Sequence, residues 1–462
     1  MEGSRGDDIS IDTAACQQIR QHNCSAEENV LRSSGLYIDT GSVESDLTSS
    51  MENIASQNSF LSNKCCIFET PKILFRHNEN AYVPFAFSIG PLHHGKPHLI
   101  GTEEIKLKYM QDLLSQLKGS DPNRSATILK TLVEDIATLE DVVRQCYAVP
   151  VRFSRNEFIK ILLVDGCFLV ELFRKRASER RLENDPIFTR PCMHAALGYD
   201  LFLLENQIPW MVLDRLFSRT TFPSGMLLTQ LAVNYFHLDY FARQESEMVM
   251  YSMPSTLNHS NHILDLLRNT LVWSAKPQGG GIIGTWTLIP SASSLMEAGV
   301  KFKKGGKSNG ILNIKFNDGV LEIPPLVIHE SSETIFRNMI SFEQCYHSCY
   351  PSITSYAILL DCLINTPKDI EILCENGIIQ NWLNPDEATQ IFNNLYNDAY
   401  VTKFYYLELC QDINNYCKLR WPRWRAMYVR NHFSSPWAIA SQVLAAIIFI
   451  LSLLQTVFSI KK

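Results

Sequence analysis

The chain has 462 residues and a formal net charge of −6, and 46% of its residues are hydrophobic. This length exceeds what one compact core usually holds, so two lobes or one large irregular domain are expected. The composition is that of an ordinary globular protein. The negative net charge, with basic residues gathered beside one hydrophobic segment, argues against nucleic acid as a partner.

The first sixty residues differ in charge from the rest of the chain. Three arginines stand against ten Asp and Glu residues, so the local charge is 3 − 10 = −7. Ser, Asn and Gln are frequent and apolar periodicity is absent, which predicts a disordered acidic leader over residues 1–60. No apolar segment follows a basic start, so a cleavable signal peptide is not expected.

Residues 64–275 are predicted to form a helical lobe. Thr102 precedes a segment in which apolar residues recur every four positions as far as Gly119. Ser125 opens a second segment with the same spacing. Both patterns are typical of amphipathic helices that begin at a capping residue.

A third helix is predicted from a capping box, in which a Ser or Thr side chain and the Glu three residues later bond each other's backbone. Ser154 and Glu157 have this spacing and precede an almost wholly apolar stretch, residues 158–173. A helix that is apolar on nearly all sides is buried. The stretch is too short and too polar to span a membrane, so it is expected at the centre of the lobe.

The glycine-rich run Lys276–Thr285 is predicted to be a flexible join to a second lobe, residues 285–412. Strand-like runs between Val300 and Ile323 are separated by Asp318-Gly319, a strong hairpin signal, and predict a small antiparallel sheet. Helices are expected over residues 260–273 and 332–346, after Pro367 and after Pro385. The predicted fold class is therefore mainly α with a small antiparallel β-sheet.

The C-terminal run Trp437–Ile460 contains no charged residue. As a helix it would be about 36 Å long, enough to cross a hydrocarbon core of about 30 Å. The alternative is a buried core helix, but such helices rarely run so far without a charge. The sequence predicts a large soluble domain held by one transmembrane helix, with membrane lipid as a partner.

The preceding segment, residues 413–436, contains no Asp or Glu and is rich in cations and aromatics. Such residues suit a lipid headgroup layer, although a solvated basic helix end would have the same composition. The predicted membrane-interface residues are Arg420, Trp421, Arg423, Trp424, Arg425, Arg430 and Trp437.

The expected location is a single-pass protein of the plasma membrane or an endomembrane with most of its chain in the cytosol. The basic cluster before the span and the absence of a signal favour this orientation. The 13 cysteines are scattered, as in proteins of reducing compartments. Glycosylation of the sequons at Asn23, Asn123 or Asn258 would reverse the orientation.

Several runs together resemble a plant-specific family known as domain of unknown function 247, in that family's order. They are Pro71–Gly95, Leu162–Phe173, Asp200–Leu213, Ser291–Lys304, Leu321–Cys345 and Ser435–Ser441. The resemblance covers about residues 64–460. Leu92 replaces a usual aromatic, and Trp210 stands where Phe is common. The resemblance implies a membrane-anchored plant protein without established catalysis, and some grass members are pollen-side determinants of self-incompatibility.

The leading functional hypothesis is a non-enzymatic, membrane-anchored recognition protein with an unknown protein partner. The resemblance sharpens it to cell–cell recognition of the pollen self-incompatibility type. The alternatives are a hydrolase-like enzyme using buried carboxylates and a scaffold for defence or growth signalling. The common nucleophile and nucleotide motifs do not occur in the sequence, and no cofactor is expected.

The histidines His93 and His94, with His77 and His98 nearby, raise the question of a metal site. Their spacing lacks the helical i, i+4 pattern of a zinc face, and no carboxylate or Cys lies between them. A turn whose imidazoles bond the backbone is the preferred interpretation. Cys345-x-His347-x-Cys349 also departs from zinc-knuckle spacing, so no metal ligand is assigned.

Four carboxylates, Asp165, Glu171, Asp200 and Glu205, lie within strongly apolar runs. Burial raises a carboxyl pKa and could suit general acid–base chemistry. Buried carboxylates that bond backbone amides or pair with Arg are the structural alternative, and Glu205-Asn206-Gln207 is expected to form a polar knot at a helix end. The family-motif residues given structural roles are His93, His94, Asp165, Glu171, Glu205 and Asn206, and no catalytic residue is assigned.

Overall fold

The computed structural model describes residues 40–56, 62–118, 124–178, 184–220, 225–236, 259–272, 281–282, 287–306, 310–401, 403–419 and 436–460. The chain divides into two compact units, Met1–Leu61 and Ser62–Lys462. The first unit contains helix α2 (Thr40–Ser56) in a region where the sequence predicted disorder. Val43, Leu47 and Met51 recur every four residues, a helical spacing that a prediction from charge overlooks. Residues 1–39 lie outside the described residues.

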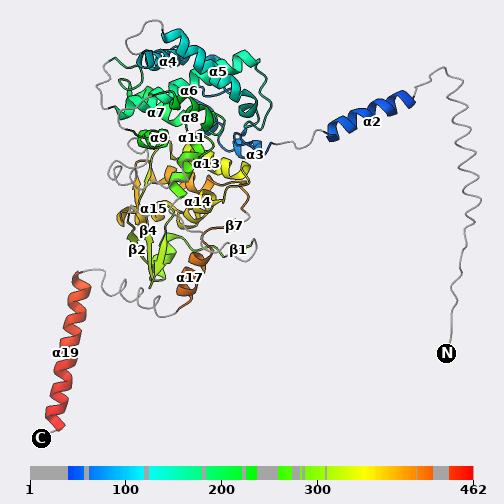
Figure 1. Cartoon of the computed structure of the whole chain (residues 1–462). Helices are drawn as coiled ribbons and strands as arrows, with labels where there is room; N and C mark the ends of the chain where they lie inside the picture. Colours follow the sequence, from blue (N-terminus) through cyan, green and yellow to red (C-terminus); the bar gives the residue numbers. More distant parts are fainter. Residues whose placement is uncertain are drawn as a thin grey trace, which may run out of the picture. The chain divides into compact units, whose positions relative to one another are not determined.

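The first half of the second unit is helical, as predicted (Figure 1). Its helices are α3 (Lys72–Phe75), η1 (Glu79–Tyr82), η2 (Pro97–Thr102), α4 (Glu103–Lys118), α5 (Arg124–Arg144), α6 (Arg155–Ala177), α7 (Pro191–Asp200), α8 (Trp210–Ser218), α9 (Leu228–Phe236) and α11 (Ile263–Val272). The three helices argued from capping residues and apolar spacing correspond to α4, α5 and α6.

Helix α6 is the centre of this half. Both reciprocal bonds of the predicted capping box are present between Ser154 and Glu157. Helices α4, α5, α8 and α9 all pack against α6, and its residues Phe168 and Leu169 have no exposed surface. A Cβ at Gly166 would lie 2.4 Å from Leu216 Cδ1, so this glycine permits the close approach of α8.

The second half contains helices α12 (Ala292–Glu297), α13 (Ser332–Cys345), α14 (Ser352–Leu363), α15 (Pro367–Glu375), α16 (Pro385–Asn394) and α17 (Leu407–Lys418). Helix α13 packs against both η1 and α11, which belong to the first half. The two predicted lobes therefore share a buried boundary. Of the predicted join, Gly281–Ile282 forms strand β1 and pairs with β7 (Lys403–Phe404), while the rest lies outside the described residues. The division into lobes at this join stays a prediction.

The three-stranded sheet is mixed rather than antiparallel. Strand β3 (Lys315–Asn317) and β4 (Val320–Ile323) form the predicted hairpin, with positive φ at Asp318 and Gly319. Strand β2 (Lys301–Lys304) pairs parallel with β4, so the order is β2-β4-β3. The antiparallel prediction was wrong for β2, because β4 lies between β2 and β3 and runs parallel to β2. A further pair, β5 (Leu326–Ile328) and β6 (Ile379–Asn381), is parallel.

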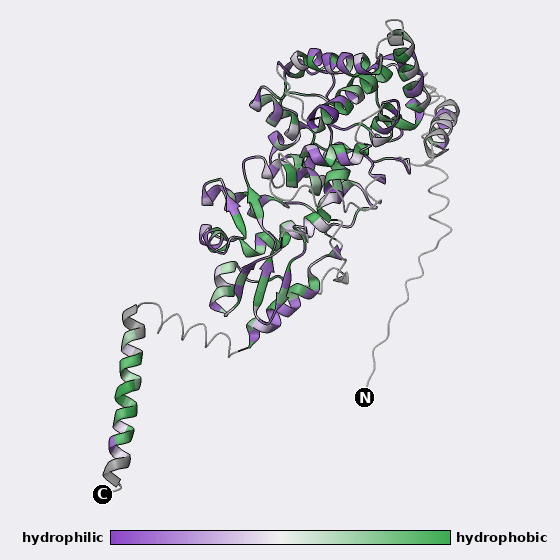
Figure 2. Ribbon diagram, turned by 60° about the vertical axis from the view of Figure 1, so that its left-hand side comes forward, coloured by the Kyte–Doolittle hydropathy of each residue, from purple (hydrophilic) through white to green (hydrophobic). Residues whose placement is uncertain are grey.

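The C-terminal run forms helix α19 (Pro436–Ile460), whose central part is strongly hydrophobic in Figure 2. Within the part of the chain that the structure describes, no helix is both long enough and apolar enough to cross a membrane. The interface residues Arg420, Trp421, Arg423, Trp424, Arg425 and Arg430 lie outside the described residues, and of Trp437 only the helical backbone is described.

Candidate functional site

The residues singled out by the sequence converge on one irregular segment, residues 84–95, here called the buried loop. Phe87, Ser88 and Ile89 in this loop have no exposed surface, although the segment contains no helix or strand. Buried backbone N–H and C=O groups outside regular structure need side-chain partners, because an unpaired one costs about 1–3 kcal/mol. The motif carboxylates and amides supply those partners.

Asp200 lies at the C-terminal end of α7 and has no exposed surface. Its carboxylate accepts three backbone N–H bonds, from Phe85 at 2.7 Å, Ala86 at 2.9 Å and Phe87 at 2.7 Å. Burial raises its pKa to about 7, and the three N–H bonds act in the opposite direction. All three donors are backbone N–H groups of the buried loop, so Asp200 holds this loop in place.

Asp165, from the middle of α6, forms a buried ion pair with Lys106 of α4. Lys106 Nζ lies 2.6 Å from Asp165 Oδ1 and also donates to the carbonyl of Ser88 at 2.8 Å. Asp165 Oδ2 accepts the N–H of Gly90 at 2.8 Å. Burial raises the pKa of Asp165, and the Lys106 charge opposes that shift. Gly90 has φ +77°, and a Cβ there would lie 2.4 Å from the carbonyl oxygen of Gln207.

The predicted polar knot is present after α7. Asn206 accepts the N–H of Ile89 at 2.7 Å and donates to the carbonyl of Phe87 at 2.9 Å. Gln207 donates to the carbonyl of Leu203 at 2.9 Å. Glu205 accepts the N–H of Thr70 at 2.8 Å, and burial raises the pKa of its carboxyl group. Asn206 thus joins the knot to the buried loop through both of its amide atoms.

The turn interpretation is confirmed only in part, because His98 alone of the four histidines contacts a backbone carbonyl. His98 contacts the carbonyl of Pro84 at 3.2 Å, and the His94 ring meets Phe153 edge-on. His77, outside the loop, pairs with Asp398 at 2.7 Å. Among the residues that the structure describes, no group of three or more His, Cys, Asp or Glu side chains is arranged to hold a metal.

His93 is the most buried of these histidines and is 2% exposed. Its Nδ1 lies 2.6 Å from Lys96 Nζ and its Nε2 lies 3.4 Å from Glu205 Oε2. Because the Lys96 ammonium can only donate, Nδ1 is the acceptor and the ring is neutral. Burial, together with the Lys96 and His98 charges, lowers the pKa of His93 to about 3. The contact with Glu205 is therefore not an ion pair of two charged groups.

This neutral histidine predicts a pH dependence of stability. Between pH 6.5, the ordinary pKa, and the lowered value of about 3, the unfolded chain binds a proton at His93 that the folded protein does not. Acidification through this window should lower the free energy of unfolding by about 1.4 kcal/mol per pH unit from this group. His93→Asn should flatten the acid side of the profile measured by urea unfolding. Equal slopes for wild type and His93→Asn would contradict the assignment.

Glu171 lies two turns along α6 from Asp165 and takes no part in the buried loop. It accepts a hydrogen bond from Gln116 of α4 and lies 3.5 Å from Arg174. Burial raises its pKa to about 7, with Arg174 opposing the shift. Glu171 therefore links α4 to α6, as the structural interpretation of this carboxylate predicts.

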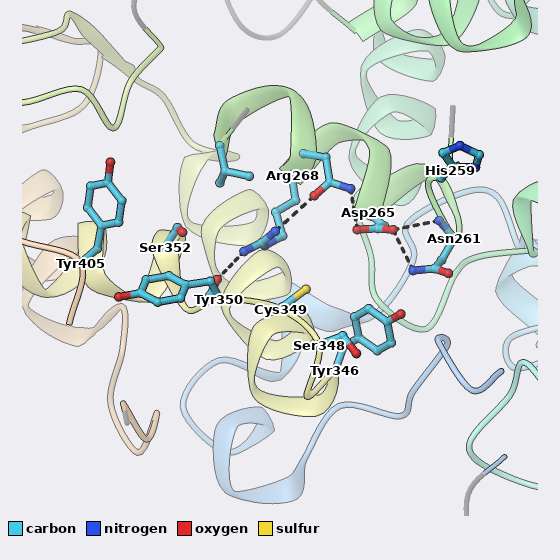
Figure 3. Close-up of a pocket in the computed structure, with 12 residues that line it drawn as sticks. His259, Asn261, Asp265, Arg268, Tyr346, Ser348, Cys349, Tyr350, Ser352 and Tyr405 are labelled. Carbon is cyan, nitrogen blue, oxygen red and sulfur yellow. Dashed lines mark hydrogen bonds between the residues drawn. The ribbon is translucent and has the colours of Figure 1, made fainter. Parts of the chain in front are cut away.

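A separate hollow of about 370 Å³ lies where α11 meets the end of α13 (Figure 3). Its wall includes Asp265, which accepts from Asn261 and Asn269, and Arg268, which donates to the carbonyl of Tyr350. Arg268 also makes a buried ion pair with Glu343 of α13 at 2.6 Å. The charges in this wall already have partners within the fold.

Sequence reasoning missed Lys106, Asn338 and Arg268, although each has a signal. Lys106 precedes the buried residues Tyr109 and Leu113 by three and seven positions, which places it on the apolar face of α4. Asn338 accepts the N–H of Leu204 at 2.9 Å and donates to the carbonyl of Ala81 at 2.7 Å. All three are polar residues on the apolar face of a helix, and this sequence pattern would have identified them as candidates for buried polar contacts.

These buried polar contacts connect four of the runs that carry the family resemblance, and comparison with known proteins agrees. Residues 67–451 match the model of the family DUF247, described as plant protein of unknown function. The chain belongs to this family. This DUF247 protein is similar to the UPF0481 protein At3g47200 of Arabidopsis thaliana, with 27% identity over 86% of each chain.

A second relative, the putative UPF0481 protein At3g02645 of Arabidopsis thaliana, is 23% identical over 84% of this chain and 89% of its own length. No solved structure matches the chain. Membership of DUF247 therefore gives a plant origin for the family but no activity.

Proposed function

We propose that this DUF247 protein is a non-enzymatic recognition protein that helix α19 holds at a membrane. The observation that carries the proposal is the exposure of apolar side chains in α19. The large hydrophobic residues described between Val443 and Leu454 are 48% to 66% exposed. Exposed apolar surface of this extent requires a lipid or protein environment, and a helix satisfies its own backbone polar groups as lipid demands.

Over the whole run Trp437–Ile460, which is longer than the part of α19 whose side chains the structure describes, the sequence contains no charge, and this favours lipid over a protein groove. The basic and aromatic residues of segment 413–436 suit the headgroup layer on the cytosolic side. On this proposal the membrane contacts Arg420, Trp421, Arg423, Trp424, Arg425, Arg430 and Trp437, and the rest of the chain lies in the cytosol.

The non-enzymatic part of the proposal rests on the motif carboxylates. Asp165 and Asp200 each accept hydrogen bonds at both carboxylate oxygens, from Lys106 and from backbone N–H groups, and Glu205 accepts the N–H of Thr70. A general acid or base needs a proton-transfer path to a substrate, and these carboxylates face the buried loop instead. A body of this kind offers its surface, rather than a reaction centre, to a partner protein.

The membrane anchor is tested with the full-length protein and a variant that ends at Ser435. After a sodium carbonate wash, the full-length protein should stay in the membrane pellet and the shortened variant should move to the supernatant. Protease added to sealed vesicles should degrade the body if it lies in the cytosol. Release of the full-length protein by carbonate would overturn the anchor.

The recognition role is read out with the same pair of proteins, each fused to a proximity-labelling enzyme in the source tissue. The full-length protein should label a reproducible set of protein neighbours that the shortened variant loses. Some grass members of the family are pollen-side self-incompatibility determinants, and this sharpens the proposal to pollen if the source is a grass. Transcripts confined to leaves or roots would rule out the pollen role and favour a scaffold for defence or growth signalling. Absence of any reproducible neighbour would count against recognition itself.

A further inference from the structure

Two buried cysteines, Cys66 and Cys146, lie side by side near the start of the second compact unit. Cys66 is 3% exposed and Cys146 is 2% exposed. Both are free thiols, and neither belongs to the buried loop or to the membrane helix.

The backbone fixes the separation of the two cysteines. Ile67 and Tyr147 form an isolated parallel bridge, and Cys66 and Cys146 are the residues that precede them. The N–H groups of Cys66 and Ile67 both donate to the carbonyl of Cys146 at 2.9 Å, and that of Ala148 donates to Ile67 at 2.8 Å. The direct backbone bond from Cys66 to Cys146 makes the two residues close neighbours. Disulfide-bonded Cα atoms lie about 4.4–6.8 Å apart, a separation that residues joined by a backbone hydrogen bond can have.

The two thiols differ in their role. The Cys146 thiol donates to the carbonyl of Val142 at 3.4 Å. The neighbouring Cys66 thiol and the Lys64 charge lower the pKa of Cys146, whereas the neighbouring Cys146 and burial raise the pKa of Cys66. Because its pKa is the lowered one, we assign Cys146 as the nucleophile of the pair.

A hollow in the fold reaches both residues of the pair. Cys66 and Cys146 both line a hollow of about 700 Å³, together with Lys64, Trp210 and Leu228. The hollow is far larger than the about 30 Å³ that one water molecule occupies in the liquid, so a small oxidant fits within it.

We propose that Cys66 and Cys146 form a dithiol site that reacts with hydrogen peroxide and closes to a disulfide. The Cys146 thiolate attacks one peroxide oxygen, the O–O bond breaks, and the products are a Cys146 sulfenic acid and hydroxide, which takes up a proton to become water. The Cys66 sulfur then attacks the Cys146 sulfur and releases a second water. Two thiols are oxidised and one peroxide is reduced to two waters, so the step balances.

The bond would fix residues 65–67 to the end of α5. The carbonyl of Cys66 also contacts His262 Nε2 at 3.0 Å, next to the start of α11. The disulfide would therefore make residues 65–67, near the start of the second compact unit, more rigid.

The test uses the full-length protein in mild detergent, treated with hydrogen peroxide, then unfolded in urea, blocked with N-ethylmaleimide and digested with trypsin. We expect peptide Cys65–Lys72 to be linked to peptide Gln145–Arg152, with both thiols resistant to the blocking reagent until dithiothreitol is added. The untreated protein should show both thiols blocked. A treated protein in which exposed Cys192 is oxidised while Cys66 and Cys146 still react with the reagent would overturn the proposal.

Two matched variants separate the neighbouring cysteines of the first peptide. Cys66→Ser should abolish the link, and Cys65→Ser should retain it. The wild-type peptide map decides the existence of the link even if a variant folds poorly. A link that survives in Cys66→Ser and is lost in Cys65→Ser would show that Cys65, and not Cys66, bonds Cys146, and would overturn the proposal. None of these results depends on membrane anchoring or recognition.

Discussion

Lys106→Met should lower the free energy of unfolding by about 3–5 kcal/mol, because it leaves the buried Asp165 carboxylate without its counter-charge. Asp165 is 1% exposed and Lys106 has no exposed surface, so water cannot replace the lost partner. The carbonyl of Ser88 in the buried loop loses its donor as well. Against a typical total of about 5–15 kcal/mol, this loss would shift the urea midpoint strongly.

The matched control is Lys130→Met on α5. Lys130 is 3.9 Å from Glu134, and both side chains are more than half exposed. Such a pair contributes about 0–1 kcal/mol. If Lys106→Met proved as mild as Lys130→Met, the ion pair would not be holding the buried loop. Loss of function at unchanged stability would instead return weight to a catalytic role for Asp165.

Glu343→Gln should be similarly damaging, at about 3–5 kcal/mol. Glu343 Oε1 accepts from Arg268 and from the N–H of Ile353, and its Oε2 accepts the N–H and hydroxyl of Thr354. A glutamine offers one acceptor oxygen and turns an NH₂ group towards a donor. The change also leaves the Arg268 guanidinium charged and unpaired at the boundary between the two halves.

A double-mutant cycle measures how much of this destabilisation comes from leaving one charge of the Arg268–Glu343 pair without its partner. Arg268→Met combined with Glu343→Met should destabilise less than the sum of the two single changes, since neither charge is then left unpaired. Glu322→Gln is the exposed control, because its partner Lys303 is 64% exposed in the side chain. Additive losses in the cycle would show that Arg268 and Glu343 are not coupled.

Local signals in the sequence were enough to predict much of the helical fold. The capping residue Ser154 and the helix-starting Pro367 and Pro385 act within a few residues, and α6, α15 and α16 begin where they indicate. The hairpin at Asp318-Gly319 was predictable for the same reason. The parallel pairing of β2 with β4 was not, because it depends on a connection whose path no short motif specifies.

The site was half predictable on similar grounds. Burial of Asp165 and Asp200 follows from their apolar neighbours, and the knot at Asn206 follows from three consecutive polar residues before Ile208-Pro209. Their partners did not follow. The spacing to Tyr109 and Leu113 places Lys106, and not Lys108, on the apolar face of α4. That Lys106 meets Asp165 depends on the angle at which α4 crosses α6, and the sequence pattern does not fix that angle.

The buried loop is bonded to residues that come much later in the sequence, and this affects folding during synthesis on the ribosome. The N–H of Phe87 bonds Asp200, which is synthesised 113 residues later, and the N–H of Ile89 bonds Asn206, which is synthesised 117 residues later. At about 5–20 residues per second, the loop's apolar residues leave the ribosome roughly 6–23 s before their partners exist. Until then Phe87 and Ile89 are surfaces to which a chaperone can bind, so the first half of the body cannot complete its core until residues 200–206 have been made.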